Sequence, residues 1–582
     1  ASFGVAVGSQ ALRNNTTGEA NTAIGKDGLL SNTTGSFNTA IGLQALKTNT
    51  TADGNTACGD QCLKDNTTGA NNSAFGRVAL ENNTNGNRNV ALGGLALRKN
   101  TTASNNTAVG YESLKENLTG QSNTAVGAFS LDSNLSSNNT SIGFNSLTAN
   151  TTGGSNTAVG YQSLLSNTTG TENVAVGSHS LDANTTASSN TAVGFKALKA
   201  NTEGFQNTSI GHKALDANTT GNNNVALGRA SLGANTTASN NTAVGESALA
   251  ANTTGSNNVA LGYQALDANT TAHQNTAVGY LSLTSNTTGT LNVALGSQTL
   301  KANTTGNDNT ALGFKALQAN TTASNNTAVG SAALLANTTG TQNTAVGANA
   351  LDANTTGLNI TAIGYNAGTS VTTGSSNTFI GADAGQATTV GNTNIAIGRE
   401  SLYTNVGGDR NVAIGHHALY FMNPSGNNAD TNNTAIGHTA LQHCSTGHSN
   451  TAIGGQALNS NTSASSNTAV GYQSLTASTT GKRNTAVGTN AGDSITTGDN
   501  NLSLGFQADP SSATADNEVT LGNSSIATLR CNVQTISSLS DARDKTNVID
   551  LPEGLDFITK LRPVKFEWAT RDGNGKDGSY EH

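Results

Sequence analysis

A unit of seventeen residues repeats along almost the whole chain, and this periodicity constrains the fold more than any other feature. The unit from Asn173 to Ser189 reads NVAVGSHSLDANTTASS, and we number its positions from 1 at Asn173 to 17 at Ser189. Across the chain, position 3 is usually Ala, position 4 is Val, Ile or Leu, position 5 is Gly, position 8 is small and position 9 is Leu. Positions 12 to 15 usually read Asn-Thr-Thr followed by Gly or Ala. Such a repeat is typical of architectures in which each unit contacts only its neighbours.

The glycines at position 5 keep one register from Gly8 to Gly522. Thirty-one of them follow at seventeen-residue steps, with one residue deleted before Gly143 and five inserted before Gly437. So short a unit cannot hold a pair of helices, and its residues at positions 2 to 4 alternate with a period of two. The sequence therefore predicts an all-β fold, a parallel β-solenoid of about thirty-one coils with one repeat per coil.

Within one coil, the pattern predicts short strands near positions 1–5 and 7–11, joined by turns. Glycine at position 5 permits a positive φ or a close approach of two backbones, and Asn-Thr-Thr-Gly is a turn sequence. Stacking places each asparagine over the next, which predicts ladders of side-chain amides. At about 4.8 Å per coil, the shaft would be on the order of 150 Å long.

The interior of such a coil is thin, because each repeat offers one apolar residue at position 4 and one leucine at position 9. Three repeats carry Gly368, Gly385 or Gly492 in place of that leucine; in two of them an apolar residue, Val371 or Ile495, appears three places later. We therefore expect parallel chains to associate as a homotrimer, with positions 4 and 9 divided between the coil interior and contacts between chains. The Asn-Thr-Ala-Val-Gly core is similar to the Ser-Val-Ala-Ile-Gly coil of trimeric autotransporter adhesin heads, whose coils are shorter.

Composition excludes several classes of function. Only 34% of residues are hydrophobic and 11% are charged, with a net charge of −8 and no basic run that would follow the phosphates of a nucleic acid. No apolar stretch approaches the roughly 20 residues of a membrane span, so neither nucleic acid nor a membrane is an expected partner. The four cysteines lack zinc-ligand spacing, and we expect no cofactor.

Aromatic residues gather at position 6. We expect these rings to pack between coils or between chains, and the alternative is a stripe that stacks on host sugars. They are Tyr111, Tyr161, Tyr263, Tyr280, Tyr365, Tyr472, Phe144, Phe195, Phe314 and Phe506.

Histidines form a second local cluster, in which His416 and His438 share position 6 of adjacent coils. Their rings are therefore expected to stack. Histidines that face the axis of a trimer would bind a transition metal through neutral imidazole, but no carboxylate partner is evident in the sequence. We take surface histidines as the leading interpretation and a metal site as the weaker alternative.

The five-residue insertion falls between Tyr420 and Asn432, where Tyr420, Phe421 and Met422 precede a proline. A loop with two aromatic rings on a polar rod is a candidate receptor contact. A tolerated insertion explains the same residues equally well.

The repeat stops after Gly522, and residues 526–539 alternate apolar and polar side chains as a connecting strand would. From Ser540 to Trp568 the chain reads SDARDKTNVIDLPEGLDFITKLRPVKFEW, with two prolines, the single tryptophan and many charges. This shift in composition predicts three parts: a shaft over 1–522, a connecting strand over 523–539 and a separate segment over 540–582.

The last part resembles the intramolecular chaperone family found at the C-terminus of phage and large-virus fibres, which is also classed as a serine peptidase family. The Ser-Asp-x-Arg-x-Lys opening, Gly-Leu-x-x-Ile and Leu-Arg-Pro-Val carry the resemblance. It implies a short α+β domain that trimerises, templates the shaft and then cuts the chain before the serine. Carried over, Ser540 is the nucleophile, Lys545 the general base and Leu539–Ser540 the scissile bond. The 43 residues from Ser540 to His582 are fewer than the family's domain, which predicts a partial segment.

Together these features predict a trimeric fibre shaft on the virion surface that attaches to a host receptor, with a glycan as one candidate. The alternatives are a bacterial surface adhesin and, less favoured, a glycan-cleaving fibre enzyme. The adhesin would continue into a heptad stalk. The enzyme needs paired carboxylates in a cleft, and the acidic residues of the shaft show no recurrent pairing.

Overall fold

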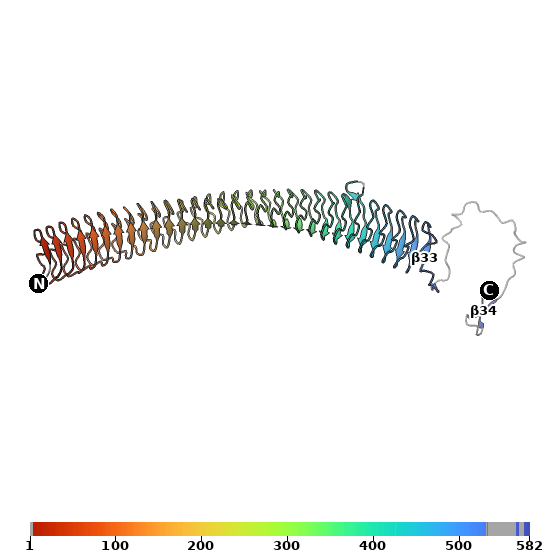
Figure 1. Cartoon of the computed structure of the whole chain (residues 1–582), viewed down its shortest axis with the longest axis horizontal. Coiled ribbons are helices and arrows are strands. Elements are labelled where there is room, and N and C mark those ends of the chain that lie inside the picture. The colour runs from red at the N-terminus through yellow and green to blue at the C-terminus, as the bar shows by residue number, and fades with distance from the viewer. Residues whose placement is uncertain (1–3, 425, 531, 533–565, 570–575, 582) are drawn as a thin grey trace. The chain divides into compact units, whose positions relative to one another are not determined.

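The computed structural model describes residues 4–424, 426–530, 532, 566–569 and 576–581. The chain divides into two compact units, Ala1–Asn523 and Ser524–His582. The first unit contains the repeats, and its coils stack in sequence order along one rod (Figure 1).

Each coil contributes one three-residue strand to a single parallel sheet of thirty-one strands. Its strands are β1 (Val5–Val7), β2 (Thr22–Ile24), β3 (Thr39–Ile41), β4 (Thr56–Cys58), β5 (Ser73–Phe75), β6 (Val90–Leu92), β7 (Thr107–Val109), β8 (Thr124–Val126), β9 (Thr140–Ile142), β10 (Thr157–Val159), β11 (Val174–Val176), β12 (Thr191–Val193), β13 (Thr208–Ile210), β14 (Val225–Leu227), β15 (Thr242–Val244), β16 (Val259–Leu261), β17 (Thr276–Val278), β18 (Val293–Leu295), β19 (Thr310–Leu312), β20 (Thr327–Val329), β21 (Thr344–Val346), β22 (Thr361–Ile363), β23 (Thr378–Ile380), β24 (Ile395–Ile397), β26 (Val412–Ile414), β28 (Thr434–Ile436), β29 (Thr451–Ile453), β30 (Thr468–Val470), β31 (Thr485–Val487), β32 (Leu502–Leu504) and β33 (Val519–Leu521).

The strands cover positions 2 to 4 of the repeat and pair in register with the next coil, as Ala175 pairs with Ala192. Two short strands, β25 (Gly408–Asp409) and β27 (Ala429–Asp430), pair separately and in parallel. The prediction of a parallel β-solenoid with one repeat per coil is confirmed.

Glycine at position 5 is required on two counts. Gly245 has φ = +131°, a region that side-chain-bearing residues rarely adopt, and a Cβ there would lie 2.5 Å from the carbonyl oxygen of Gly262 in the next coil. Both expected reasons for this glycine, positive φ and close approach, therefore operate together.

The predicted second strand near positions 7–11 is wrong. The chain turns there, because positions 7 and 9 adopt left-handed conformations, with φ = 56° at His179 and 50° at Leu181. A left-handed leucine costs about 1–2 kcal/mol. Burying its side chain returns about 1.5–3 kcal/mol, and Leu181 is fully buried.

The structure shows how positions 4 and 9 divide: position 9 lies in the coil interior and position 4 faces outward, whereas contact between chains at position 4 stays a prediction. In a pleated strand, positions 2 and 4 face one side and position 3 the other, and the structure turns position 3 inward. Ala175 and Leu181 are buried, whereas Val176 faces outward and is half-buried. The interior of the coil is thus built from Ala at position 3 and Leu at position 9.

The predicted asparagine ladders are present, one at position 1 and one at position 12. In the first, the Asn258 backbone N–H donates to Asn241 Oδ1 (2.9 Å). In the second, Asn252 Nδ2 donates to Asn235 Oδ1 in the preceding coil (2.9 Å). The two ladders meet because Asn241 Nδ2 and Asn252 Nδ2 both donate to the carbonyl oxygen of Gly255, each at 2.9 Å. Buried amides are thereby satisfied within the protein.

In the predicted connecting strand over 523–539, the described residues 523–530 and 532 contain no strand. Strands of this fold form by pairing with the next coil, and the repeat has ended at Gly522. Residues 531 and 533–539 lie outside the described part. Within the second unit, β34 (Phe566–Ala569) and β35 (Lys576–Glu581) pair antiparallel, with Phe566 opposite Glu581.

Candidate functional site

The inserted loop of residues 420–432 is the first candidate site, and it projects from the rod in Figure 1. Its second half is tied to the preceding coil: Thr431 Oγ1 donates to the carbonyl oxygen of Asp409 (2.9 Å), and Arg410 pairs with Asp430 (2.5 Å). Asn392 Nδ2 also donates to Asn428 Oδ1 at 3.1 Å. These contacts hold the second half of the loop against the preceding coils, where the chain returns to the rod.

The predicted receptor contacts in this loop separate into two groups. Phe421 is 42% exposed and Tyr420 is half-buried. Met422 is fully buried, so its prediction as a surface contact is wrong. Met422 occupies position 12, where it replaces a ladder asparagine inside the coil, and Asn433 Nδ2 lies 3.9 Å from its Sδ.

Around the loop, five rings form a continuous aromatic cluster, which we define as Tyr403, His417, Tyr420, Phe421 and His443. Tyr403 and Tyr420 stack with centroids 4.8 Å apart, and Phe421 stacks on His443 at 5.3 Å. An edge contact between Tyr420 and Phe421 (4.6 Å) joins the two stacks, and His417 makes a further edge contact with Tyr420 (4.8 Å). The sequence identified Tyr420 and Phe421 but missed Tyr403, which occupies the same position one repeat earlier.

One histidine of this cluster, His417, has a carboxylate partner that the sequence analysis missed. His417 Nε2 lies 2.6 Å from Glu400 Oε2. Arg399 lowers the pKa of Glu400 by hydrogen bonding, and His417 lowers it further. The detectable signal was spacing, since Glu400 and His417 lie one repeat apart.

The expected stacking of His416 and His438 is confirmed, with centroids 5.5 Å apart. Desolvation, followed by the neighbouring His417, lowers the pKa of His416 and favours its neutral form. Within the described residues of one chain, no group of three or more His, Cys, Asp or Glu side chains is placed to hold a metal. A metal held between chains by His416 and His438 stays a prediction.

The outer face of the thirty-one-stranded sheet is a second candidate site. We call it the sheet face and define it by the side chains at positions 2 and 4. Apolar side chains recur along it from end to end, and exposed apolar surface of this extent is typical of interaction sites. The exposed ones at position 4 are Val7, Ile24, Ile41, Phe75, Leu92, Ile142, Ile210, Leu227, Leu261, Leu295, Leu312, Ile363, Ile453, Val487 and Leu521.

The position-6 aromatics border this face and are about half exposed in one chain. Some contact rings of the next coil, as Tyr263 and Tyr280 do with centroids 5.6 Å apart. Packing between coils therefore accounts for part of the position-6 pattern, as expected, and leaves one side of each ring open.

One carboxylate pair escaped the sequence analysis. Burial raises the pKa of Asp493, and the neighbouring Asp509 raises it further by charge repulsion and hydrogen bonding. The two residues lie in successive coils near the end of the shaft. This pair is isolated, because the neighbouring repeats carry no matching acids at those positions.

The residues predicted for self-cleavage, Leu539, Ser540 and Lys545, lie outside the described part of the chain. Comparison with known families covers the segment that contains Ser540 and Lys545, and the roles of these residues stay predictions. Residues 540–582 match the family model described as chaperone of endosialidase, Peptidase_S74. The chain carries a C-terminal segment of this chaperone family, which is typical of phage tail fibres.

The match begins at Ser540, the residue expected to open the segment. A Peptidase_S74 segment implies a fibre-like protein that matures by autocleavage, is associated with the virion and acts in trimers. No curated protein and no solved structure matches the chain. Among the described residues, no helix has the length and apolar character that a membrane crossing requires.

Proposed function

We propose that this protein is the trimeric shaft of a phage fibre, that it attaches the virion to a host surface, and that its C-terminal segment cuts itself off after assembly. One observation carries the proposal. A solenoid with an exposed apolar sheet face along its length is followed in the same chain, after residues 523–539, by a segment of the Peptidase_S74 chaperone family.

The sheet face is the surface through which we expect three parallel chains to associate. Covering one half-exposed Val, Ile or Leu gains about 1 kcal/mol, and the same residue types recur in most of the thirty-one coils. Parallel chains in register repeat the same contact at every coil, so small gains accumulate along the shaft. The aromatic rings at position 6 would extend this contact at its border.

Host attachment is assigned to the aromatic cluster and the loop beside it. The flat apolar faces of Tyr420 and Phe421 suit the C–H faces of a sugar ring, and the stacking with Tyr403 and His443 holds them in place. Fibres with Tyr420→Ala and Phe421→Ala should adsorb poorly to host cells. Phe37→Ala, which removes a 68%-exposed ring far along the shaft, should leave adsorption unchanged.

Self-cleavage follows from an activated serine. Lys545 accepts the proton of the Ser540 hydroxyl, and Oγ attacks the carbonyl carbon of Leu539. Lys545 then returns the proton to the Ser540 nitrogen, so that the amide bond breaks and leaves a free amine and an ester between Leu539 and Ser540 Oγ. Water then hydrolyses the ester. Lysine can serve as a base when desolvation lowers its pKa.

The test uses the protein expressed from its complete gene, with mass spectrometry of the mature shaft. We expect a C-terminus at Leu539, no cleavage in Ser540→Ala, slow cleavage in Lys545→Ala and normal cleavage in the control Ser538→Ala. Cleavage after trimer formation should not depend on protein concentration. An uncut Leu539–Ser540 bond in a properly assembled wild-type fibre would contradict the proposal.

A further inference from the structure

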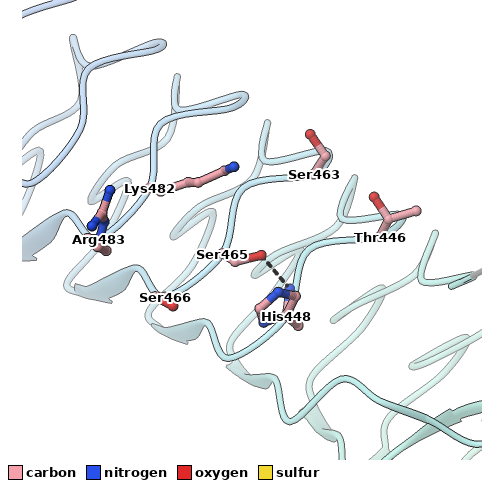
Figure 2. Close-up of a pocket in the computed structure, with 7 residues that line it drawn as sticks. All are labelled: Thr446, His448, Ser463, Ser465, Ser466, Lys482 and Arg483. Atoms are coloured by element: carbon pink, nitrogen blue, oxygen red, sulfur yellow. Dashed lines mark hydrogen bonds between the residues drawn. The ribbon is translucent and has the colours of Figure 1, made fainter.

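A polar hollow opens beside the sheet in three successive coils near the C-terminal end of the shaft (Figure 2). Its volume is about 380 Å³, at the lower end of the range of small-molecule sites. The lining comes from repeat positions 14, 16 and 17, which lie outside the sheet face. Nitrogen-bearing side chains are supplied by His448, Lys482 and Arg483, and hydroxyl groups by Thr446, Ser463 and Ser466.

Two adjacent cations and a histidine line this hollow, and none of the residues that line it is acidic. Several cations of the shaft pair with an acid one repeat away, as Arg98 does with Glu81 (3.0 Å) and Arg229 with Glu246 (2.7 Å). Within the described residues, neither Lys482 nor Arg483 forms an ion pair. The nearest acid in sequence register, Asp499, accepts a hydrogen bond from the Lys482 backbone N–H (2.7 Å) and does not line the hollow.

Position 16 explains why a hydrogen-bond donor faces the hollow. In many coils a short polar side chain at this position accepts a bond from the amide at position 16 of the preceding coil, as Ser465 Oγ does for the His448 N–H (3.1 Å). In the next coil, position 16 is Lys482, whose side chain has no hydrogen-bond acceptor. The Ser465 amide therefore lacks the partner that the repeat normally supplies, and Figure 2 shows Lys482 extending toward that coil.

We propose that this hollow binds an oxyanion carried by a surface sugar, either the carboxylate of an acidic sugar or a sugar phosphate. Lys482 and Arg483 contact the oxyanion, the Ser465 amide donates to it, and the hydroxyls of Ser463 and Ser466 bond the sugar. The inference rests on the proposed role in attachment and specifies the ligand chemistry. Exposed ion pairs are individually weak, so binding depends on the several copies that a trimeric fibre presents.

The test measures retention of the complete fibre on surfaces coated with a glucuronate-bearing oligosaccharide, a hexose phosphate or a neutral glucose oligosaccharide. The variant is Lys482→Gln with Arg483→Gln. The control is Arg13→Gln with Lys213→Gln, which removes the same charge from exposed positions in distant coils. We expect wild-type retention on an anionic surface, a loss of about tenfold or more in the variant, and less than about twofold change in the control.

Binding to the glucuronate surface alone identifies an acidic sugar as the source, and binding to the phosphate surface alone identifies a sugar phosphate. Equal retention on the neutral surface, equal losses in variant and control, or no retention on either anionic surface would overturn the proposal. Host-cell adsorption separates this inference from the attachment role. A variant that loses anion binding yet adsorbs normally refutes only the role of this hollow in attachment, whereas wild-type fibres that fail to adsorb refute attachment itself.

Discussion

The coils of residues 173–359 and those of residues 360–449 follow the same backbone path around different interiors. The first set repeats Ala at position 3, Leu at position 9 and Asn at position 12 with few exceptions. In the second set, Phe379 replaces Ala, Gly368 and Gly385 replace Leu, and apolar or sulfur-bearing residues replace ladder asparagines at Val371, Met422 and Cys444. All of these replacements except the glycines present buried apolar side chains.

The difference shows that the coil interior is filled by compensation between neighbouring coils. A Cβ added at Gly385 would lie 2.3 Å from the Phe379 ring, and one at Gly368 would lie 2.8 Å from it. Phe379 therefore fills the space of two missing leucines. Where the ladder is interrupted, the last asparagine turns to its own coil: Gly357 N–H donates to Asn354 Oδ1 at 3.1 Å, before Val371.

Both regions share glycine at position 5, and we expect its substitution to destabilise the shaft more than any other change considered below. Gly245→Ala should unfold the surrounding coils, because it adds a backbone clash to a φ strain of about 1–3 kcal/mol. Gly426→Ala in the loop is the matched control, since Gly426 has φ = +138° but an added Cβ would meet nothing within 4 Å. Amide hydrogen exchange in the coils around each site measures the local stability of the two variants. Equal effects of the two substitutions would show that close packing of the backbones contributes nothing.

Compensation in the altered region is tested at Phe379. Phe379→Ala should destabilise its coils by about 3–5 kcal/mol, because it leaves a cavity at a fully buried site. Adding Gly368→Leu and Gly385→Leu should restore stability, since both glycines have φ near 60°, close to the 50° of Leu181. The exposed Phe37→Ala serves as control for thermal unfolding. A triple variant less stable than Phe379→Ala alone would contradict compensation.

The coils of residues 173–359 should tolerate an apolar residue in place of a ladder asparagine at position 12, with a small loss of stability. Asn252→Val removes two donated bonds and one accepted bond, but Asn235 Oδ1 can then accept from the Ala238 N–H, as Asn354 does before Val371. We expect a loss of about 1 kcal/mol by thermal unfolding, against no change for exposed Thr254→Val. Complete loss of folding in Asn252→Val would show that the regular coils depend on an unbroken ladder.

Alkylation of the native cysteines distinguishes the coil interior from the sheet face without any substitution. Burial raises the pKa of Cys62 and of Cys444 to about 12, so their thiolates stay scarce as pH rises toward 10, and alkylation should be slow in any folded coil. Cys58, at position 4, is half-buried in one chain. Peptide-level mass spectrometry should find Cys58 protected only in the assembled fibre, whereas rapid alkylation there would place the sheet face in solvent.

Much of this fold was predictable because a strict repeat exposes its own register. The coil, the role of Gly245 and the asparagine ladders all follow from residues seventeen apart. The outward orientation of Val176 could not be predicted in this way, because a Val-Ala-Val strand is apolar on both faces. Only the left-handed turn at His179 and Leu181 decides which face lies in the interior. Sequence rules disfavour left-handed leucine, so that turn was taken for a strand.

The candidate sites were predictable where position in the repeat sufficed. Tyr420 and Phe421 were found as exposed rings in an insertion, and Met422 was misplaced because its occupation of a ladder position becomes evident only once the coil path is known. Glu400 was missed because its partner lies in the next coil rather than nearby in sequence.

The mass of the folded protein in solution tests the central claim most directly, namely that three chains share the sheet face. Light scattering on the purified fibre should give three times the mass of one chain. A folded shaft with the mass of one chain or two would contradict the account, because the apolar sheet face would then have to be stable in water or covered in another way.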